Sequence, residues 1–282
     1  MKLGLVLEGG ASRTYFSVGV MDALMDENIW ADYCIGASAG IANGISYMSR
    51  QRGRSIEIGR KYLHDKRYMG WRHFINPKNK SYYNIPFVFE EMPRDHVPFD
   101  YETFEKNCAE TYAAVTNIAT GASEYIPLTA EDKTWKALVA SCALPGLFPP
   151  ILLNKALYMD GGIADPIPVL QAIKDGCDRV IVVLTREREY VKTKESGLGI
   201  ASFLFRKYPA FVETLSARTA RYNETVQQLF ELEKEGRALV LAPKNTAGWH
   251  RTESAPEKIQ KMYDEGILCV KNRREEILSF IK

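Results

Sequence analysis

A serine set between two glycines is the first residue of this chain whose surroundings favour chemistry. The run reads Gly36-Ala37-Ser38-Ala39-Gly40, and it joins a short apolar segment to a segment of helical periodicity. A sharp strand-to-helix turn of this kind projects a serine hydroxyl, and the glycines let the helix pass close to the strand. The pattern predicts that Ser38 is the nucleophile of an acyl transfer, with Gly36 and Gly40 forming the elbow. The alternative is a turn of small residues that only packs.

A glycine-rich segment near the start of the chain is the second candidate. It reads Gly9-Gly10-Ala11-Ser12-Arg13 and separates an apolar run from a helical pattern. Backbone N–H groups at a helix start have no partner within the helix, so they can stabilise the anionic oxygen of a tetrahedral intermediate. We predict an oxyanion site here, completed by the amide of Ala39. A phosphate site is the weaker alternative, because the spacing fits neither G-x-G-x-x-G nor G-x-x-x-x-G-K-[ST].

A nucleophilic serine needs a base, and the chain offers two. His250 follows the last predicted strand, where a histidine triad of the α/β-hydrolase type would place it. Only one strand and one helix precede the strand before Ser38, however, which is too early for that fold. The other candidate is Asp160, which leaves a predicted strand into Gly161 and Gly162. Partial burial raises the pKa of an aspartate and suits it to act as a base; otherwise Asp160 simply caps the turn.

The composition excludes several classes of protein. The 282 residues are 46% hydrophobic, which is enough for a large core. Thirty-seven Lys and Arg against 35 Asp and Glu give a net charge of +2, which argues against a nucleic-acid partner. The five cysteines, at positions 34, 108, 142, 177 and 269, include no C-x-x-C pair, and the four histidines lack metal-ligand spacing. We therefore expect reduced, mostly buried thiols and neither a metal nor another cofactor.

The apolar runs of the chain are short. Met1-Lys2 leads directly into the five residues Leu3 to Leu7, which is not the core of a signal peptide. No other stretch approaches the roughly 18 apolar residues that a membrane span needs. We expect a cytoplasmic protein on these grounds.

Short apolar runs alternate with helical patterns through the first sixty residues, which predicts a βαβ start and a mainly parallel sheet. Residues 50–100, rich in aromatic and basic side chains, interrupt this pattern and are predicted to be a lid or insertion over the site. A solvated, helix-forming charge pattern is the alternative. We expect residues 1–190 to form the catalytic domain and residues 191–282 a mainly helical extension packed on it. The strands are predicted at 3–7, 33–35, 112–116, 124–128, 157–159, 180–184 and 238–241, and a helix is predicted at 135–142.

Four motifs occur in a characteristic order, at residues 9–13, 36–40, 141–150 and 160–162. Together they resemble the patatin-like phospholipases, especially the bacterial branch, over roughly residues 2–184. The resemblance implies a three-layer α/β/α patatin-like fold with a central, mainly parallel sheet. It also implies a Ser-Asp dyad without histidine that hydrolyses esters of lipids or other acyl esters through an acyl-enzyme.

The family pattern assigns a role to each matching residue. Ser38 corresponds to the nucleophile and Asp160 to the general base, the amides near Gly10 and Ala11 hold the oxyanion, and Arg13 orients the loop. A lipid substrate further implies transient contact with a membrane surface, at the inner membrane face. At Ala11 and at Thr14 the family usually has glycine, so a positive φ at either position would strain this loop.

Two alternative functions stay open. One is an esterase that depends on His250. The other is a catalytically weak lipid-binding or regulatory protein on the same scaffold, suggested by Ala11 and Thr14. No motif specifies a head group, a chain length or an oligomeric state.

Overall fold

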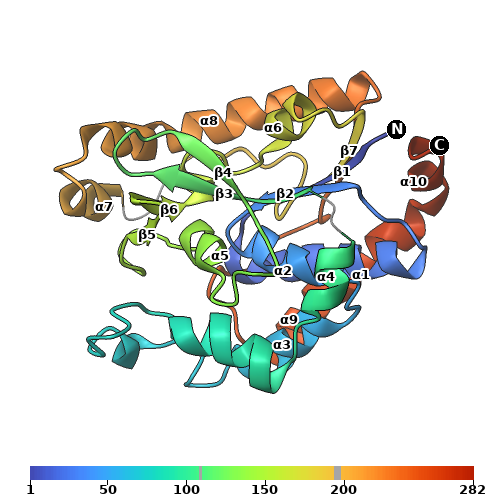
Figure 1. Cartoon of the computed structure of the whole chain (residues 1–282). Helices are drawn as coiled ribbons and strands as arrows, with labels where there is room; N and C mark the ends of the chain where they lie inside the picture. Colours follow the sequence, from blue (N-terminus) through green and yellow to red (C-terminus); the bar gives the residue numbers. More distant parts are fainter. Residues whose placement is uncertain (108–109, 194–197) are drawn as a thin grey trace.

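The computed structural model of the chain describes residues 1–107, 110–193 and 198–282, and it is built around one eight-stranded sheet (Figure 1). The strand order is β5-β6-β3-β2-β1-β7-β8, with β4 paired to β3. In this order, the five strands β3-β2-β1-β7-β8 are all parallel to one another, whereas β4 and β6 run antiparallel to β3. The strands are β1 (Leu3–Leu7), β2 (Tyr33–Ala37), β3 (Glu110–Asn117), β4 (Ser123–Pro127), β5 (Ile151–Leu153), β6 (Ala156–Asp160), β7 (Arg179–Val183) and β8 (Ala238–Leu241).

Helices cover both faces of this sheet. Side chains alternate along each strand, so Leu5 and Leu7 of β1 pack on one face and Val6 on the other. The first face carries α1 (Tyr15–Asp26), α2 (Ala39–Met48), α5 (Lys136–Ser141) and α9 (Pro256–Asn272), and the second carries α6 (Val169–Lys174) and α8 (Pro209–Lys234) (Figure 1). The predicted three-layer α/β/α fold with a mainly parallel sheet and a helical C-terminal part is confirmed.

Shorter elements complete the described chain. They are α3 (Arg54–Tyr62), α4 (Tyr101–Lys106), α7 (Leu198–Leu204), α10 (Arg274–Phe280), the 3-10 turns η1 (Ala11–Thr14), η2 (Trp71–His73) and η4 (Gly161–Ile163), and the π-helical η3 (Phe87–His96). No helix among the described residues has the length and apolar character needed to cross a membrane. Cys108 lies outside the described residues; the other four cysteines are free thiols, buried at Cys34 and Cys177 and half-buried at Cys142 and Cys269.

Strand β2 extends further than the expected 33–35, because Gly36 and Ala37 pair with Ala113 and Ala114 of β3. The same two β3 residues pair with β4, so β2 and β4 lie on opposite edges of β3. The next two residues, 115 and 116, pair with both β4 and β6. Strand β6 must therefore lie on the same edge of β3 as β2, directly beyond its end.

Strands β2 and β6 consequently run toward each other along one edge of β3. The last residue of β2, Ala37, pairs with Ala114, and the last residue of β6, Asp160, pairs with Val115. The neighbouring β3 residues Ala114 and Val115 thus pair with the end of β2 and the end of β6. Ser38 comes directly after Ala37, so the topology brings it beside Asp160 although the two are far apart in the sequence.

Candidate active site

Ser38 occupies a backbone conformation that is rare for a residue with a side chain. Its φ is 53° and its ψ is −137°, a combination that costs on the order of 1–3 kcal/mol and concentrates at functional sites. Its N–H donates to the Ser141 Oγ at 2.8 Å. A Cβ at Gly36 would lie 2.8 Å from the Leu7 carbonyl oxygen, and one at Gly40 would lie 2.6 Å from that of Glu8. Only glycine fits at these two places, so the turn can be as sharp as Ser38 requires.

Asp160 is buried at the end of β6 and is held by the backbone on two sides. Its N–H donates to the Ala143 carbonyl at 2.9 Å, and its Oδ1 accepts the Gly162 N–H at 2.8 Å. A Cβ at Gly161 would overlap the Ala114 carbonyl oxygen of β3, so the turn after Asp160 requires glycine. The Asp160 Oδ2 is buried and makes no hydrogen bond of ordinary length with any described residue, which leaves it for the Ser38 side.

The protonation of Asp160 is set mainly by its burial. Loss of solvent raises the pKa of this carboxyl above its usual range, while Arg218, the nearby Ser38 hydroxyl and the Gly162 amide oppose that rise. The Asp160 Oδ2 makes no hydrogen bond of standard geometry with the Ser38 hydroxyl, but the hydroxyl is near enough to lower the pKa of this carboxyl. A buried carboxylate with a raised pKa is a stronger base than an exposed one.

The glycine-rich loop lies directly against Ser38. A Cβ at Gly9 would lie 3.1 Å from the Ser38 Cβ. Two of its amides are engaged, because Ser12 donates to the Arg251 carbonyl at 3.1 Å and Arg13 to the Gly10 carbonyl at 3.2 Å. In contrast, the amides of Gly9, Gly10, Ala11 and Ala39 donate to no acceptor within the described ranges. Those four remain as donors for an anion.

The two positions where glycine was expected differ in conformation. Ala11 has a φ of 49°, whereas Thr14 is right-handed with a φ of −66°. The Thr14 hydroxyl donates to the Ala11 carbonyl at 2.7 Å and accepts from Asn43 at 3.0 Å. The loop therefore keeps the left-handed conformation at Ala11 and is strained there, while Thr14 adds hydrogen bonds.

Replacing Ala11 with Gly is expected to raise the free energy of unfolding by about 0.5 kcal/mol. Relief of the left-handed strain contributes about 1–2 kcal/mol, and the greater freedom of the unfolded chain removes about 0.4–1 kcal/mol. Thr14→Gly, the matched control, should lower the free energy of unfolding by about 1–2 kcal/mol through its lost hydrogen bonds. Urea denaturation measures both variants, and a shift of the same sign in both would contradict the assignment of strain to Ala11.

Two cavities meet at Ser38. Ser38, Ala11 and Leu144 line both of them. One cavity is mostly apolar and has an empty volume of about 1060 Å³, its opening to solvent included. Its walls come from α3, η3, α5 and the chain between them, including Tyr68, Phe89, Met92, Trp135 and Leu138. Residues from the 50–100 segment thus form much of this wall.

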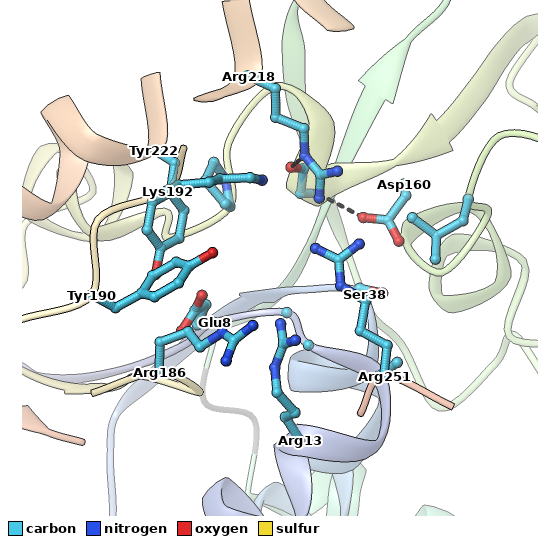
Figure 2. Close-up of a pocket in the computed structure, with 16 residues that line it drawn as sticks. Glu8, Arg13, Ser38, Asp160, Arg186, Tyr190, Lys192, Arg218, Tyr222 and Arg251 are labelled. Atoms are coloured by element: carbon cyan, nitrogen blue, oxygen red, sulfur yellow. Dashed lines mark hydrogen bonds between the residues drawn. The ribbon is translucent and has the colours of Figure 1, made fainter. Parts of the chain in front are cut away.

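The second cavity is lined by charged residues and has an empty volume of about 560 Å³, its opening to solvent included. Asp160 lines this cavity and not the apolar one. Figure 2 shows its charged and aromatic side chains, which converge from separate elements of the fold: Glu8, Arg13, Arg186, Tyr190, Lys192, Arg218, Tyr222 and Arg251. Ser38 therefore lies between an apolar chamber and a charged one.

Several residues of the polar cavity have no sequence motif. Arg186 follows β7, Arg218 and Tyr222 lie one turn apart on α8, and Arg251 lies between β8 and α9. The i, i+4 spacing on α8 is the only local pattern among them, and it is equally typical of a packed helix. His250, the alternative base, is exposed and lines neither cavity.

No group of three or more His, Cys, Asp or Glu side chains gathers as metal ligands would in the part of the chain that is described. The residues facing Ser38 are a carboxylate, backbone amides and guanidinium groups. Such a set can transfer a proton and stabilise negative charge.

Two family models match the chain. One describes the patatin-like phospholipases and matches residues 5–173; the other, a domain of unknown function (DUF6363), matches residues 208–282. The uncharacterized protein YjjU of Escherichia coli K12 is 25% identical over 189 residues, covering 65% of this chain and 52% of YjjU. Lysophospholipase nte1 of Aspergillus terreus is 29% identical over 188 residues, covering 64% of this chain and 12% of nte1. The chain therefore spans only about half of YjjU and a small part of nte1.

Among solved structures, VipD from Legionella pneumophila aligns with a TM-score of 0.42 at 13% identity, covering 96% of this chain and 67% of that one. The patatin-like match extends over more than half of the chain and includes the motifs at Ser38 and Asp160. The chain belongs to the patatin-like phospholipase family.

Proposed function

We propose that this chain is a serine acyl hydrolase that cleaves ester bonds of lipids with a Ser38-Asp160 dyad. The observation that carries the proposal is the position of Ser38 at the junction of an apolar and a polar cavity. An ester that joins an acyl chain to a polar alcohol matches this arrangement on both sides. The names of the matched relatives, lysophospholipases among them, support a lipid ester.

The chemistry proceeds through an acyl-enzyme. Asp160 takes the proton of the Ser38 hydroxyl as Oγ attacks the ester carbonyl carbon. The amides of Gly10, Ala11 and Ala39 donate to the oxyanion that forms, each worth a few kcal/mol in the transition state. Collapse of the intermediate breaks the ester C–O bond, and protonated Asp160 gives its proton to the departing alcohol. Water then attacks the acyl-enzyme with Asp160 again as base, which releases the acid and regenerates Ser38.

The two cavities orient the substrate in this scheme. The acyl chain takes the apolar cavity, because burial of its methylenes contributes about 0.8 kcal/mol each. The alcohol takes the polar cavity, which is also the one that Asp160 lines. The base thus faces the leaving group, as proton delivery to an alkoxide requires.

We further propose that residues 1–190 form the catalytic domain, that residues 50–100 act as its lid, and that residues 191–282 are an extension that completes the site. The role of residues 191–282 is supported by three of their side chains that line the polar cavity, Arg218, Tyr222 and Arg251. The exposed position of His250 gives no support to an esterase that depends on it. Ala11 holds the left-handed backbone of the loop, which favours an active oxyanion site over a merely lipid-binding protein.

A fluorophosphonate probe tests the nucleophile. We expect one equivalent of label on the peptide that contains Ser38, and hydrolysis of 1-oleoylglycerol and 4-nitrophenyl butyrate by the same protein. Ser38→Ala should abolish both the labelling and the hydrolysis. Ser216→Ala, an exposed position on α8 that lines neither cavity, is the control and should keep both. Folded protein that turns over no ester would favour the lipid-binding alternative instead.

A further inference from the structure

Three arginines line the polar cavity beside Ser38, and the proposed ester hydrolysis gives none of them a role: Arg13, Arg186 and Arg251. An uncharged alcohol such as glycerol would give these guanidinium groups no charged partner on the substrate. A leaving group that is itself anionic would supply one.

Arg13 is the clearest sign of a missing anion. Its side chain is only 5% exposed, and its buried Nε has no hydrogen-bond partner among the described residues. Burial, together with repulsion from Arg186 and Arg251, lowers the pKa of Arg13 to about 10 despite the attraction of Glu8. A buried guanidinium without a hydrogen-bonded partner is costly. An anion bound between these three arginines would remove that cost.

The neighbouring cations are placed to receive such a ligand. The Arg186 guanidinium donates from Nη1 to the Thr246 Oγ1 at 2.7 Å, and its Cζ lies 4.6 Å from the centroid of the Tyr190 ring. These two contacts fix its position. The Arg251 side chain makes no hydrogen bond or ion pair with any residue in the described ranges. Figure 2 shows Arg13, Arg186 and Arg251 pointing into the cavity from three different segments.

The two carboxylates that line the cavity attract two of the three arginines but form no hydrogen bond or ion pair with them within the described ranges. Arg251 attracts Asp160 and Arg13 attracts Glu8, although burial raises the pKa of both carboxyls. The Asp160 Oδ1 accepts the Gly162 N–H, and Glu8 accepts the Thr185 N–H. The guanidinium groups therefore keep donors for a ligand, apart from the Arg186 Nη1 that donates to Thr246.

We propose that Arg13, Arg186 and Arg251 form a subsite for a phosphomonoester on the alcohol side of the scissile bond. The preferred substrates are then acyl esters of a phosphorylated alcohol, of the 1-acylglycerol 3-phosphate type. Guanidinium groups match the geometry of phosphate oxygens, and a doubly charged phosphate balances several of them at once. A choline head group would instead bring a cation into the polar cavity, next to these three arginines. This inference rests on the proposed function.

Three substrates with one acyl chain test the subsite: 1-oleoylglycerol 3-phosphate, 1-oleoylglycero-3-phosphocholine and 1-oleoylglycerol, all below their aggregation limits. We expect kcat/KM to be highest for the phosphomonoester, at least ~10-fold above the neutral ester, as charge-assisted hydrogen bonds of this kind provide. Arg251→Gln and Arg186→Gln should each reduce that ratio several-fold, and Arg251→Lys should retain more of it than Arg251→Gln. The ratio compares two substrates of one protein sample, so a general loss of active protein cancels.

Arg274→Gln is the matched control. Arg274 lies on α10, pairs with Glu27 and Glu275, and lines neither cavity. Its variant should keep the wild-type ratio. Equal kcat/KM for the phosphomonoester and the neutral ester, or a ratio unchanged by Arg251→Gln and Arg186→Gln, would overturn the subsite.

Binding measurements separate a head-group site from a site for free phosphate, and the subsite from the proposed reaction. In calorimetry with Ser38→Ala protein, we expect 1-oleoylglycerol 3-phosphate to bind at least ~10-fold more tightly than 1-oleoylglycerol. Inorganic phosphate should compete with it only weakly. Equal competition by inorganic phosphate, without discrimination among the lipids, would overturn the head-group assignment. Discrimination in binding by a protein that hydrolyses no ester would support the subsite and refute the hydrolase.

Discussion

Asp160→Asn should reduce kcat for ester hydrolysis by roughly 10²–10⁴-fold, the usual contribution of a general base, while the folded protein becomes more stable at neutral pH. The amide keeps the size of the carboxyl and its oxygen can still accept the Gly162 N–H. It cannot take the proton of Ser38. Steady-state hydrolysis of 4-nitrophenyl butyrate measures the loss, and mass spectrometry of the slow fluorophosphonate adduct checks that Ser38 is still present and accessible.

The gain in stability follows from the sign of the pKa shift. Burial raises the pKa of Asp160 in the folded protein above the unfolded value. Between these two values the unfolded chain has released a proton that the folded chain retains, so stability falls as the pH rises through this window. Above the folded pKa the full cost of a buried charge is present. Asparagine carries no such charge, so the Tm advantage of the variant should be largest at pH 8 and shrink as the pH approaches 4.

Asp165 provides the control for this variant. It is half-buried, burial also raises the pKa of its carboxyl, and it accepts a hydrogen bond from Tyr125 at 2.7 Å. It lines neither cavity. Asp165→Asn should therefore change activity only a few-fold. Activity of Asp160→Asn within a few-fold of wild type would place the base elsewhere, and His250→Ala would then be the next variant to assay.

The proposed pair, Ser38 and Asp160, could be selected from the sequence because local sterics mark both positions. Gly36, Gly40 and Gly161 stand where a Cβ would meet backbone of a neighbouring strand or loop. These constraints leave short, recognisable runs around Ser38 and Asp160. The strands that carry them, β2 and β6, were predictable from apolar runs, since each packs helices on both faces.

Local sequence patterns could not predict that Ser38 lies beside Asp160. They also could not predict which residues line the polar cavity. The approach depends on which edge of β3 accepts β6, a long-range register that leaves no local pattern. Arg186, Arg218 and Arg251 come from three segments whose only shared feature is their final position. Arg13 lies in a recognisable glycine-rich run, but nothing in that run indicates that its side chain lines the polar cavity.

The contact between α1 and α9 yields the second large prediction. A Cβ at Gly266 would overlap the Phe16 carbonyl oxygen, and one at Gly19 would overlap that of Tyr263. The two helices therefore touch backbone to backbone. Replacing Gly266 with Ala would force them apart, at a cost of about 3 kcal/mol or more in the free energy of unfolding.

Gly199→Ala is the matched control for Gly266→Ala, because a Cβ at Gly199 in α7 meets no atom of the described residues within 4 Å. Alanine favours a helix over glycine by up to about 1 kcal/mol, so this control should lose no stability. Denaturant midpoints compare the two variants, and an equal midpoint for Gly266→Ala and wild type would show that the helices can separate freely. Since η1 leads directly into α1, displacement of α1 also moves the amides of Gly10 and Ala11. The Gly266 variant should therefore lose ester hydrolysis at temperatures where it is still folded, which would tie the segment matched by the second family model to the oxyanion loop.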